Sequence, residues 1–408
     1  MTDAAALVAG LDLDAQRWYA GKGRDERGRR VVDDWPVGPG RLIVFEVGYA
    51  DDGSDLYLLP TIDDDGLREA GPGDGVYAAL AGTAGEERAL GVDQTNTSVI
   101  VGDRIVKAYR RVEPGAHPEV ELLEALAARG FDGIPAVRGA TRRTLPDGRS
   151  VDLAIVQDLV DGAPDGWESL IAPLEALIDD EGDIGDLGPE LARVGRTMGR
   201  LHAELAAAFG VQAASEAQRE GWRDGARAQL DEALRILPHP LAAELQNDST
   251  RIRLELEGFA EGDAPLVTRV HGDLHIAQFL RTPDGVFVID FEGEPTRTVA
   301  ERRAPTSPMR DVACLVRSLD HVARSAQVRA GLGAPVMDAW IRFAQDVVLA
   351  AYEDGLGDAR IRLDRRLLRL FCIEKELYEF VYAARILPEW LYAPQLGMQW
   401  LMRDDAAL

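Results

Sequence analysis

Cysteine is scarce in this sequence. The 408 residues contain two, Cys314 and Cys372, far apart and outside any paired motif. This scarcity excludes a disulfide framework and a cysteine-based zinc site, and it predicts reduced thiols. The N-terminus lacks the basic and apolar regions of a secretory signal, and no apolar run approaches the roughly eighteen residues that a membrane span needs. We therefore expect a cytoplasmic protein that does not bind a membrane.

Positive charge is also in short supply. The chain has 45 basic and 70 acidic residues, a formal net charge of −25 at pH 7. Such an excess of negative charge repels nucleic-acid backbones unless the basic residues gather in one groove, and no basic cluster is present. We expect no nucleic-acid partner. The hydrophobic content of 46% is ample for packed cores, and the length is typical of two or three domains.

The order of short and long apolar segments indicates an α+β fold. Extended segments with turn residues between them are expected at 41–48, 56–59 and 153–160, with a hairpin over 98–107. A helix is expected over 118–128, ending near Gly130. Long amphipathic helices are then expected at 189–209, 215–237, 242–259, 338–352 and 363–387. The front third of the chain is thus rich in strands, and the rest is mainly helical.

One short β-like segment, 267–291, interrupts the helical part and carries most of the candidate chemistry. Asp273 and Gln278 are five residues apart on an expected loop, and Asp290 follows a short apolar strand. Phosphoryl transfer needs a carboxylate that takes the proton of the attacking hydroxyl, and oxygen ligands that hold Mg²⁺ against ATP. We predict Asp273 as the base, Gln278 and Asp290 as magnesium ligands, and Glu292 as a second carboxylate ligand.

Two other interpretations of the same segment stay open. His271, Asp273 and His275 alternate along the chain, so on a strand they could form a metal site with imidazole ligands. Alternatively, His271-Gly272-Asp273 could be an ordinary turn and 288–291 an ordinary strand end. Either motif alone favours this purely structural interpretation, but the two motifs together favour a functional site.

A kinase also needs a cation that holds the nucleotide phosphates, and a carboxylate that orients this cation. Lys107 ends the second strand of the expected hairpin, and Glu121 lies in the next helix. By itself, such a lysine is usually solvated. Together with the downstream segment it predicts an ion pair of Lys107 with Glu121, with Glu119 and Glu124 as rivals because acidic residues are common at helix starts.

With these motifs in place, the chain resembles the maltokinase-like branch of the aminoglycoside phosphotransferase and protein-kinase-like superfamily, which includes bacterial glucosamine kinases. The resemblance covers most of the chain in the expected order. Five local patterns carry it, at residues 17–24, 96–98, 107–121, 270–295 and 307–318.

The resemblance implies a bilobal kinase with an additional N-terminal cap. The implied parts are a β-rich cap subdomain over 1–90, a β-rich intermediate N-lobe over 91–160, and a helical C-lobe with the catalytic loop over 161–408. ATP and Mg²⁺ are the implied cofactors. Two departures from the general kinase pattern, Gln278 in place of asparagine and Asp-Phe-Glu in place of Asp-Phe-Gly, are shared by the maltokinase-like branch.

The resemblance also implies where the nucleotide binds. The residues that match Lys107 and Glu121 form the phosphate-orienting pair, and the hinge lies at Gln157, Asp158 and Val160, whose backbone would bind adenine. The front strand lacks a glycine-rich phosphate loop. Hydroxyl groups or backbone amides of Thr95, Thr97 and Ser98 are expected to replace it.

The expected acceptor is a small sugar. The favoured reaction is glucosamine to glucosamine 6-phosphate, the alternative is maltose to maltose 1-phosphate, and a third possibility is a pseudokinase that binds nucleotide without transfer. Maltokinase-like chains typically continue with Leu-Pro-Ile-Pro after the tryptophan that matches Trp390, whereas this chain reads Leu391-Tyr392-Ala393-Pro394, and this favours an aminosugar. The expected substrate-binding residues are Arg310, Asp311, Glu379, Tyr382, Arg385 and Trp390.

Overall fold

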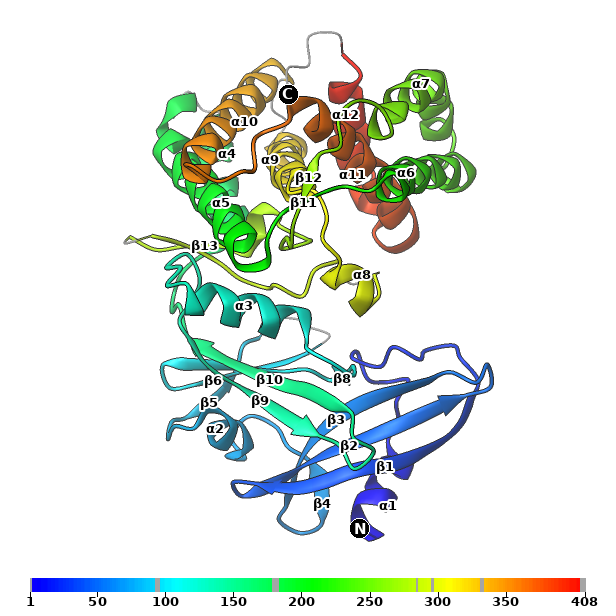
Figure 1. The fold of residues 1–408 in the computed structure, drawn as a ribbon, viewed down its shortest axis with the longest axis vertical. Helices are drawn as coiled ribbons and strands as arrows, with labels where there is room; N and C mark the ends of the chain where they lie inside the picture. The colour runs from blue at the N-terminus through cyan, green and yellow to red at the C-terminus, as the bar shows by residue number, and fades with distance from the viewer. Residues whose placement is uncertain are drawn as a thin grey trace. The chain divides into compact units, whose positions relative to one another are not determined.

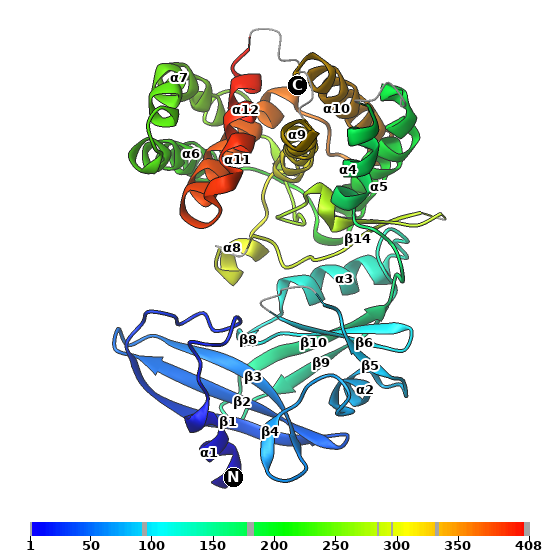
Figure 2. The same cartoon turned by 180° about the vertical axis from the view of Figure 1, so that it is seen from behind.

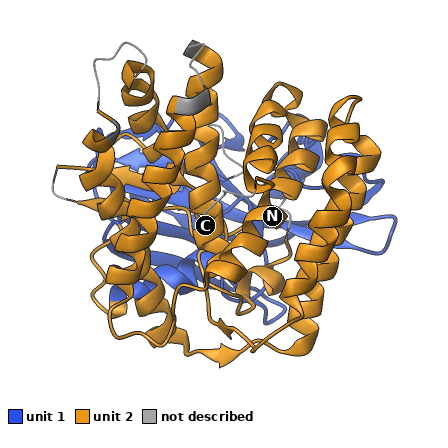
Figure 3. Cartoon of the chain, turned by 90° about the horizontal axis from the view of Figure 1, so that it is seen from above, with its two compact units in different colours: residues 1–127, 135–162 blue, residues 128–134, 163–408 orange. Residues whose placement is uncertain are grey.

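The computed structural model describes residues 2–91, 96–177, 183–283, 285–294, 297–330 and 334–403. The chain divides into two compact units: unit 1 comprises residues 1–127 and 135–162, and unit 2 comprises 128–134 and 163–408 (Figure 3). Thr95, one of the residues expected at the phosphates, lies outside the described residues.

Unit 1 contains two antiparallel sheets (Figure 1). The first has the order β1-β2-β3-β4, with β8 also paired to β3, and the second has the order β5-β6-β7-β10-β9. The strands of the first sheet are β1 (Glu26–Val37), β2 (Gly40–Tyr49), β3 (Ser54–Asp63), β4 (Leu67–Glu69) and β8 (Arg111–Val112). Those of the second are β5 (Glu87–Ala89), β6 (Thr97–Val101), β7 (Arg104–Ala108), β9 (Val137–Thr144) and β10 (Ser150–Asp158). The helices are α1 (Thr2–Gly10), α2 (Val76–Ala81) and α3 (Pro118–Ala128).

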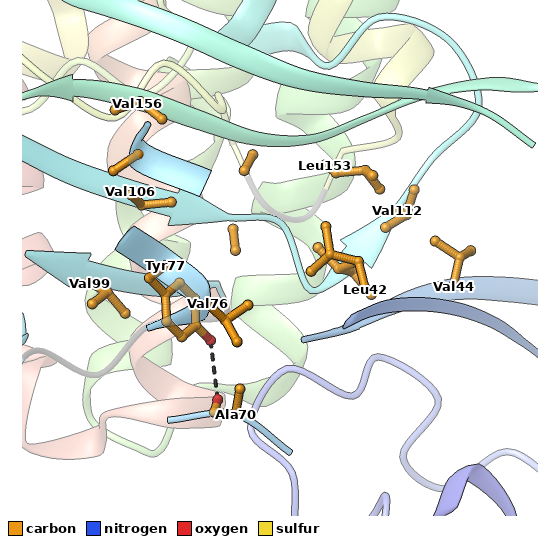
Figure 4. Packing of buried hydrophobic residues seen from close by; sticks show 14 of the residues in the cluster. Leu42, Val44, Ala70, Val76, Tyr77, Val99, Val106, Val112, Leu153 and Val156 are labelled. Carbon is orange, nitrogen blue, oxygen red and sulfur yellow. Dashed lines mark hydrogen bonds between the residues drawn. The ribbon is translucent and has the colours of Figure 1, made fainter. Parts of the chain in front are cut away.

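Strands β2 and β3 are buried on both faces because successive side chains of a strand point to opposite sides. Residues such as Ile43 and Phe45 pack with Trp18 and Tyr19 in one core. Their neighbours Leu42 and Val44 pack in another core with Val106 of β7 and Leu153 of β10 (Figure 4). One face of the first sheet therefore shares its core with the second sheet.

Two elements cross the boundary expected at residue 90. Strand β5 precedes this position but pairs with β6, and β8 follows it but pairs with β3. Each of the two sheets in unit 1 thus contains one strand from the other side of residue 90. The three-part division of the chain remains a prediction.

Unit 2 is mainly helical, and α9 runs through its middle, in contact with α4, α10, α11 and α12 (Figure 2). Residues 311–326 of α9 are all buried. The helices are α4 (Gly166–Ala176), α5 (Gly188–Phe209), α6 (Glu216–Ile236), α7 (Leu241–Leu256), α8 (Val299–Arg303), α9 (Met309–Ala330), α10 (Ala334–Leu356), α11 (Arg365–Ile386) and α12 (Tyr392–Leu401). The 3-10 turns are η2 (Ile184–Leu187), η3 (Glu257–Phe259), η4 (Ile276–Gln278) and η5 (Pro388–Trp390).

Two short strand pairs complete unit 2. They are β11 (Gln212–Ala213) with β12 (Leu266–Val267), and β13 (Phe279–Arg281) with β14 (Val286–Val288). The second pair joins the two segments that carry the candidate site residues.

Most expected elements of the sequence are present. The helix predicted over 118–128 has those bounds, and the hairpin predicted over 98–107 is formed by β6 and β7. The five long amphipathic segments are helical, with bounds that differ by a few residues and with η3 completing the third. The helix α9 was not among the predicted helices, although its sequence is amphipathic; its polar side chains are buried together with the apolar ones. None of the helices in the described part of the chain has both the length and the apolar character needed to cross a bilayer.

Candidate active site

In unit 1, the ammonium group of Lys107 is paired with Glu119. Lys107 Nζ lies 3.1 Å from Glu119 Oε2, and the hydroxyl of Tyr109 donates a hydrogen bond of 2.9 Å to the same carboxylate oxygen. The Glu119 side chain is buried. Glu119, one of the two rivals of Glu121, is thus a partner of Lys107, and the choice of Glu121 stays a prediction. Glu119 lies in the first turn of α3, from where its side chain reaches the lysine on β7.

Ser98 lies directly opposite Lys107 on the neighbouring strand. The antiparallel register of β6 and β7 pairs these two residues, and Ile155 of β10 faces Lys107 on the other side. Directly opposed residues of antiparallel strands carry their side chains on the same face of the sheet. The serine hydroxyl and the lysine ammonium are thus presented together, as a phosphate-binding pair requires.

The expected hinge is the end of β10. The Gln157 amide donates to the carbonyl of Pro135, and the Asp158 carboxylate is paired with Arg138. The backbone N–H of Asp158 donates to Ala136 O at 2.9 Å, and that of Leu159 to Asp103 O at 2.9 Å. These bonds hold the strand end in place, and the amide of Val160, the next residue, takes part in none of them.

In unit 2, the two candidate loops come into backbone contact at a pair of glycines. Gly272 has φ +93° and Gly293 has φ +76°, values that side chains disfavour. A Cβ atom on Gly272 would lie 3.2 Å from the Cα atom of Gly293. His271 Nε2 also lies 2.9 Å from the carbonyl oxygen of Ile289. Small residues at these two positions therefore allow the loop of Asp273 to lie against the segment that follows Asp290.

Gln278 and Asp290 are brought together as the sequence predicts. Gln278 Nε2 donates to Asp290 Oδ2 at 3.2 Å and lies 3.2 Å from His275 Nε2. Burial lowers the pKa of His275 below its usual value, so the neutral ring can accept this hydrogen bond. Both amide hydrogens of Gln278 are then used, and its carbonyl oxygen is the atom left to act as a ligand.

Asp290 has a left-handed backbone conformation, with φ +65°. Such a value is uncommon for a residue other than glycine, although aspartate tolerates it better than most. It directly follows the short strand β14 and turns the chain toward Gly293. Local strain of this kind is concentrated at functional sites.

A pocket opens beside Asp273 within unit 2. Its wall combines three carboxylates with three cationic side chains and several neutral groups. The lining residues are Gln229, Gly272, Asp273, Glu294, Arg297, Arg310, Cys314, Phe371, Glu374, Lys375 and Tyr378.

Of the expected substrate-binding residues, Arg310 lines this pocket, where it is paired with Glu374 at 3.1 Å. Glu379 and Tyr382 do not line it, but each contacts a residue that does: Glu379 is paired with Lys375, and Tyr382 stacks on Tyr378.

The other three expected residues do not line this pocket, and their role in substrate binding stays a prediction. Asp311 is fully buried and bonded to the backbone of the loop that carries Asp273. Arg385 is paired with Glu232 of α6, and Trp390 packs against Trp167.

Sequence reasoning missed the pocket-facing residues of α11. Phe371, Glu374, Lys375 and Tyr378 recur at the helical spacings of three and four, so they share one face. The residues chosen instead, 379, 382 and 385, recur every three residues, and that spacing drifts by about 60° per step around a helix. The three- and four-residue spacing is visible in the sequence. Only the position of the pocket shows that this face of α11 lines it.

The alternative of a metal site with two imidazoles finds no support in the described residues. His271 is buried, with Nε2 against Ile289 O and Nδ1 accepting from the N–H of Asp273 at 3.3 Å. In the described ranges, the group of His, Cys, Asp and Glu side chains close enough to share an ion is Asp320, His321 and Glu376. Arg317 pairs with both carboxylates of that group, and Arg324 also lies 3.5 Å from Asp320, so both carboxylates already have arginine partners.

Comparisons with known proteins show which family this chain resembles. Residues 86–344 match the phosphotransferase enzyme family. A glucosamine kinase of Streptacidiphilus jiangxiensis is 36% identical over 331 residues, which cover 78% of this chain and 74% of that protein. A glucosamine kinase of Mycolicibacterium smegmatis is 30% identical over 367 residues, which cover 83% and 91%.

Solved structures are similar over nearly the whole chain. A glucosamine kinase in complex with glucosamine, ADP and inorganic phosphate superposes with a TM-score of 0.82 at 30% identity, and the match covers 98% of this chain and 99% of that one. A second crystal form of a glucosamine kinase gives a TM-score of 0.84. The family resemblance and the α+β kinase-like fold predicted from the sequence are confirmed, and the chain belongs to the phosphotransferase enzyme family.

Proposed function

We propose that this protein is a glucosamine kinase that transfers the γ-phosphate of ATP to the 6-hydroxyl of glucosamine. The observation that carries the proposal is its similarity, over almost its full length, to glucosamine kinases, one of them solved with glucosamine and ADP. The pocket beside Asp273 supports it, because Glu294 and Glu374 supply carboxylates for an ammonium sugar.

In the proposed reaction Asp273 is the general base. It takes the proton of the acceptor hydroxyl while the acceptor oxygen bonds to the γ-phosphorus and the bond from that phosphorus to the bridging oxygen of ADP breaks. Asp273 is suited to this role because its side chain is partly exposed at the pocket wall, and its loop is held by buried bonds.

The remaining residues hold the nucleotide. Lys107, oriented by Glu119, and Ser98 beside it are the proposed phosphate-binding groups. The amide of Val160 is the proposed hinge donor for adenine, because the amides of Asp158 and Leu159 are already bonded.

The donor set of Gln278 and Asp290 fits Mg²⁺. The carbonyl oxygen of Gln278 and the carboxylate of Asp290 would hold the ion, with Glu292 as a further ligand. An all-oxygen set of this kind suits a hard cation. When bound, magnesium neutralises charge on the nucleotide phosphates.

An acceptor screen tests the proposed function. ADP release is measured with magnesium and a panel that includes glucosamine, glucose and maltose, for the parent protein and for Asp273→Asn. We expect turnover with glucosamine, and a loss of at least about 100-fold in kcat for the variant because the amide cannot take the proton.

Other outcomes of the screen are equally informative. Turnover of maltose without glucosamine would make the protein a maltokinase. ATP binding with no sugar-dependent ADP release would favour the pseudokinase. Equal activity of parent and Asp273→Asn would remove Asp273 as the base.

A further inference from the structure

Lysine is rare in this protein, and one lysine lies in the acceptor pocket. Among the 45 basic residues of the sequence, only Lys22, Lys107 and Lys375 are lysines, and the others are arginines. The two side chains are not equivalent. An ammonium group is a compact point charge, whereas a guanidinium group is a planar fork that tends to bind both oxygens of a carboxylate. A lysine in a pocket of an arginine-rich chain therefore suggests a need for the smaller cation.

Lys375 lies on α11 and extends toward the proposed base. Its Nζ atom is 4.0 Å from Oδ1 of Asp273 and 2.9 Å from Oε1 of Glu379, one helical turn further on. The ammonium group also lies 4.8 Å from the ring centre of Tyr378. Burial disfavours the charged form, but Glu379 and Asp273 outweigh this effect and hold the pKa of Lys375 well above its ordinary value. The group is a fixed cation at the pocket wall.

A second donor reaches the same oxygen of Asp273. The thiol of Cys314, on α9, lies 3.8 Å from Oδ1. Burial raises the pKa of this thiol, so it stays protonated and can donate a weak hydrogen bond. Lys375 and Cys314 thus approach Oδ1 from two different helices, and neither contact involves Oδ2.

We propose that Lys375 is a positioning residue for the catalytic carboxylate: tethered by Glu379, its ammonium group holds Oδ1 of Asp273 so that Oδ2 faces the acceptor hydroxyl. This inference rests on the proposed function of Asp273 as the base. It also explains the choice of lysine, because a guanidinium fork at this position would cover both oxygens and block the one that takes the proton.

Steady-state kinetics of two Lys375 variants test the inference. Lys375→Met removes the cation, and we expect kcat to fall by about 10- to 100-fold, the effect of a misplaced reacting group, while KM for ATP stays within about threefold. Lys375→Arg keeps the charge, yet kcat should also fall. Glu379→Gln, which loosens the tether, should give a smaller fall in kcat. Arg365→Met is the matched control, since it removes an exposed cation from the first turn of the same helix.

The results separate the alternatives. Wild-type kcat in Lys375→Met or in Lys375→Arg would overturn the inference, as would a raised acceptor KM with unchanged kcat, which would make Lys375 an acceptor-binding residue. A lowered melting temperature of Lys375→Met would mean that its loss of kcat could come from unfolding. In that case the kcat values of Lys375→Arg and Glu379→Gln test the inference.

The acceptor used is whichever sugar the parent protein phosphorylates. A failure of the proposed acceptor then appears in the parent protein, and a failure of this inference appears only in the variants.

Discussion

Asp311 is a fully buried carboxylate that binds the backbone of the loop that carries Asp273. Its two oxygens accept hydrogen bonds from the backbone N–H groups of His271 at 2.8 Å and Gly272 at 2.9 Å. His202 Nε2 lies 3.1 Å from the same carboxylate. Burial by itself would raise the pKa of Asp311, but the bond from His202 and the other donors outweigh it and lower the pKa. Asp311 therefore fixes the backbone of the loop that carries Asp273 and does not itself reach the pocket.

This arrangement predicts a pH-dependent contribution to stability. A carboxylate whose pKa is lowered by folding stabilises the protein above its unfolded pKa of about 3.9, and the stabilisation is lost as the pH falls toward the folded value. Asp311→Asn removes this titration and leaves a backbone N–H without its acceptor, which costs about 1–3 kcal/mol near pH 7. Urea unfolding from pH 7 to pH 3 should show the parent and variant curves converging as the pH falls. A difference that stays constant with pH would contradict the ionised state.

At the scale of helices, α9, α11 and α12 meet around a buried ion cluster. Arg317 of α9 pairs with Asp320 at 2.7 Å and with Glu376 of α11, and all three side chains are fully buried. His321 Nε2 lies 3.1 Å from the Glu376 carboxylate. Gly397 of α12 packs directly on this cluster, because a Cβ atom there would lie 2.6 Å from Arg317 Nη2 and 2.7 Å from Glu376 Oε1. The absence of a side chain at 397 thus sets how closely α12 approaches α9.

Gly397→Ala should therefore destabilise unit 2. Overpacking against a buried ion pair costs about 1–3 kcal/mol, in spite of the better helix propensity of alanine. Gly221→Ala is the matched control, because Gly221 also lies within a helix but a Cβ atom added there would meet none of the described residues within 4 Å. The control should be neutral or more stable by up to about 1 kcal/mol. Thermal unfolding of both variants measures the difference, and a Gly397→Ala protein as stable as its control would contradict the close packing.

At the scale of the whole molecule, the two sheets of unit 1 depend on one shared core. Leu58 of β3 is fully buried in the same cluster as Val99 of β6 and Val106 of β7. Elements on both sides of residue 90 therefore contribute side chains to the same interior. A cluster of this kind is expected to unfold as one cooperative unit.

Leu58→Ala tests this cooperativity. The variant should lose about 2–5 kcal/mol of stability in unit 1 because a buried leucine leaves a cavity. Hydrogen exchange should then become faster in β6, β7 and β10 as well as in β2 and β3. Faster exchange confined to the first sheet would show that the cap is an independent domain. Leu254→Ala serves as the control, since this leucine of α7 is 70% exposed.

The sequence by itself determined the class of fold, the strand pair that carries Lys107, and the pairing of Gln278 with Asp290. These features depend on local spacing, on turn residues and on chemistry that is recognisable within twenty residues. Tertiary structure decided the rest. The contact of Glu119 with Lys107 depends on the rotation of α3. Arg310 and Asp311 are neighbours on α9, and the direction in which each side chain faces decides that Arg310 lines the pocket while Asp311 is buried. Which face of α11 lines the pocket likewise follows from how that helix packs on its neighbours, because the side chains along it present several faces of similar polarity and only the packing selects one.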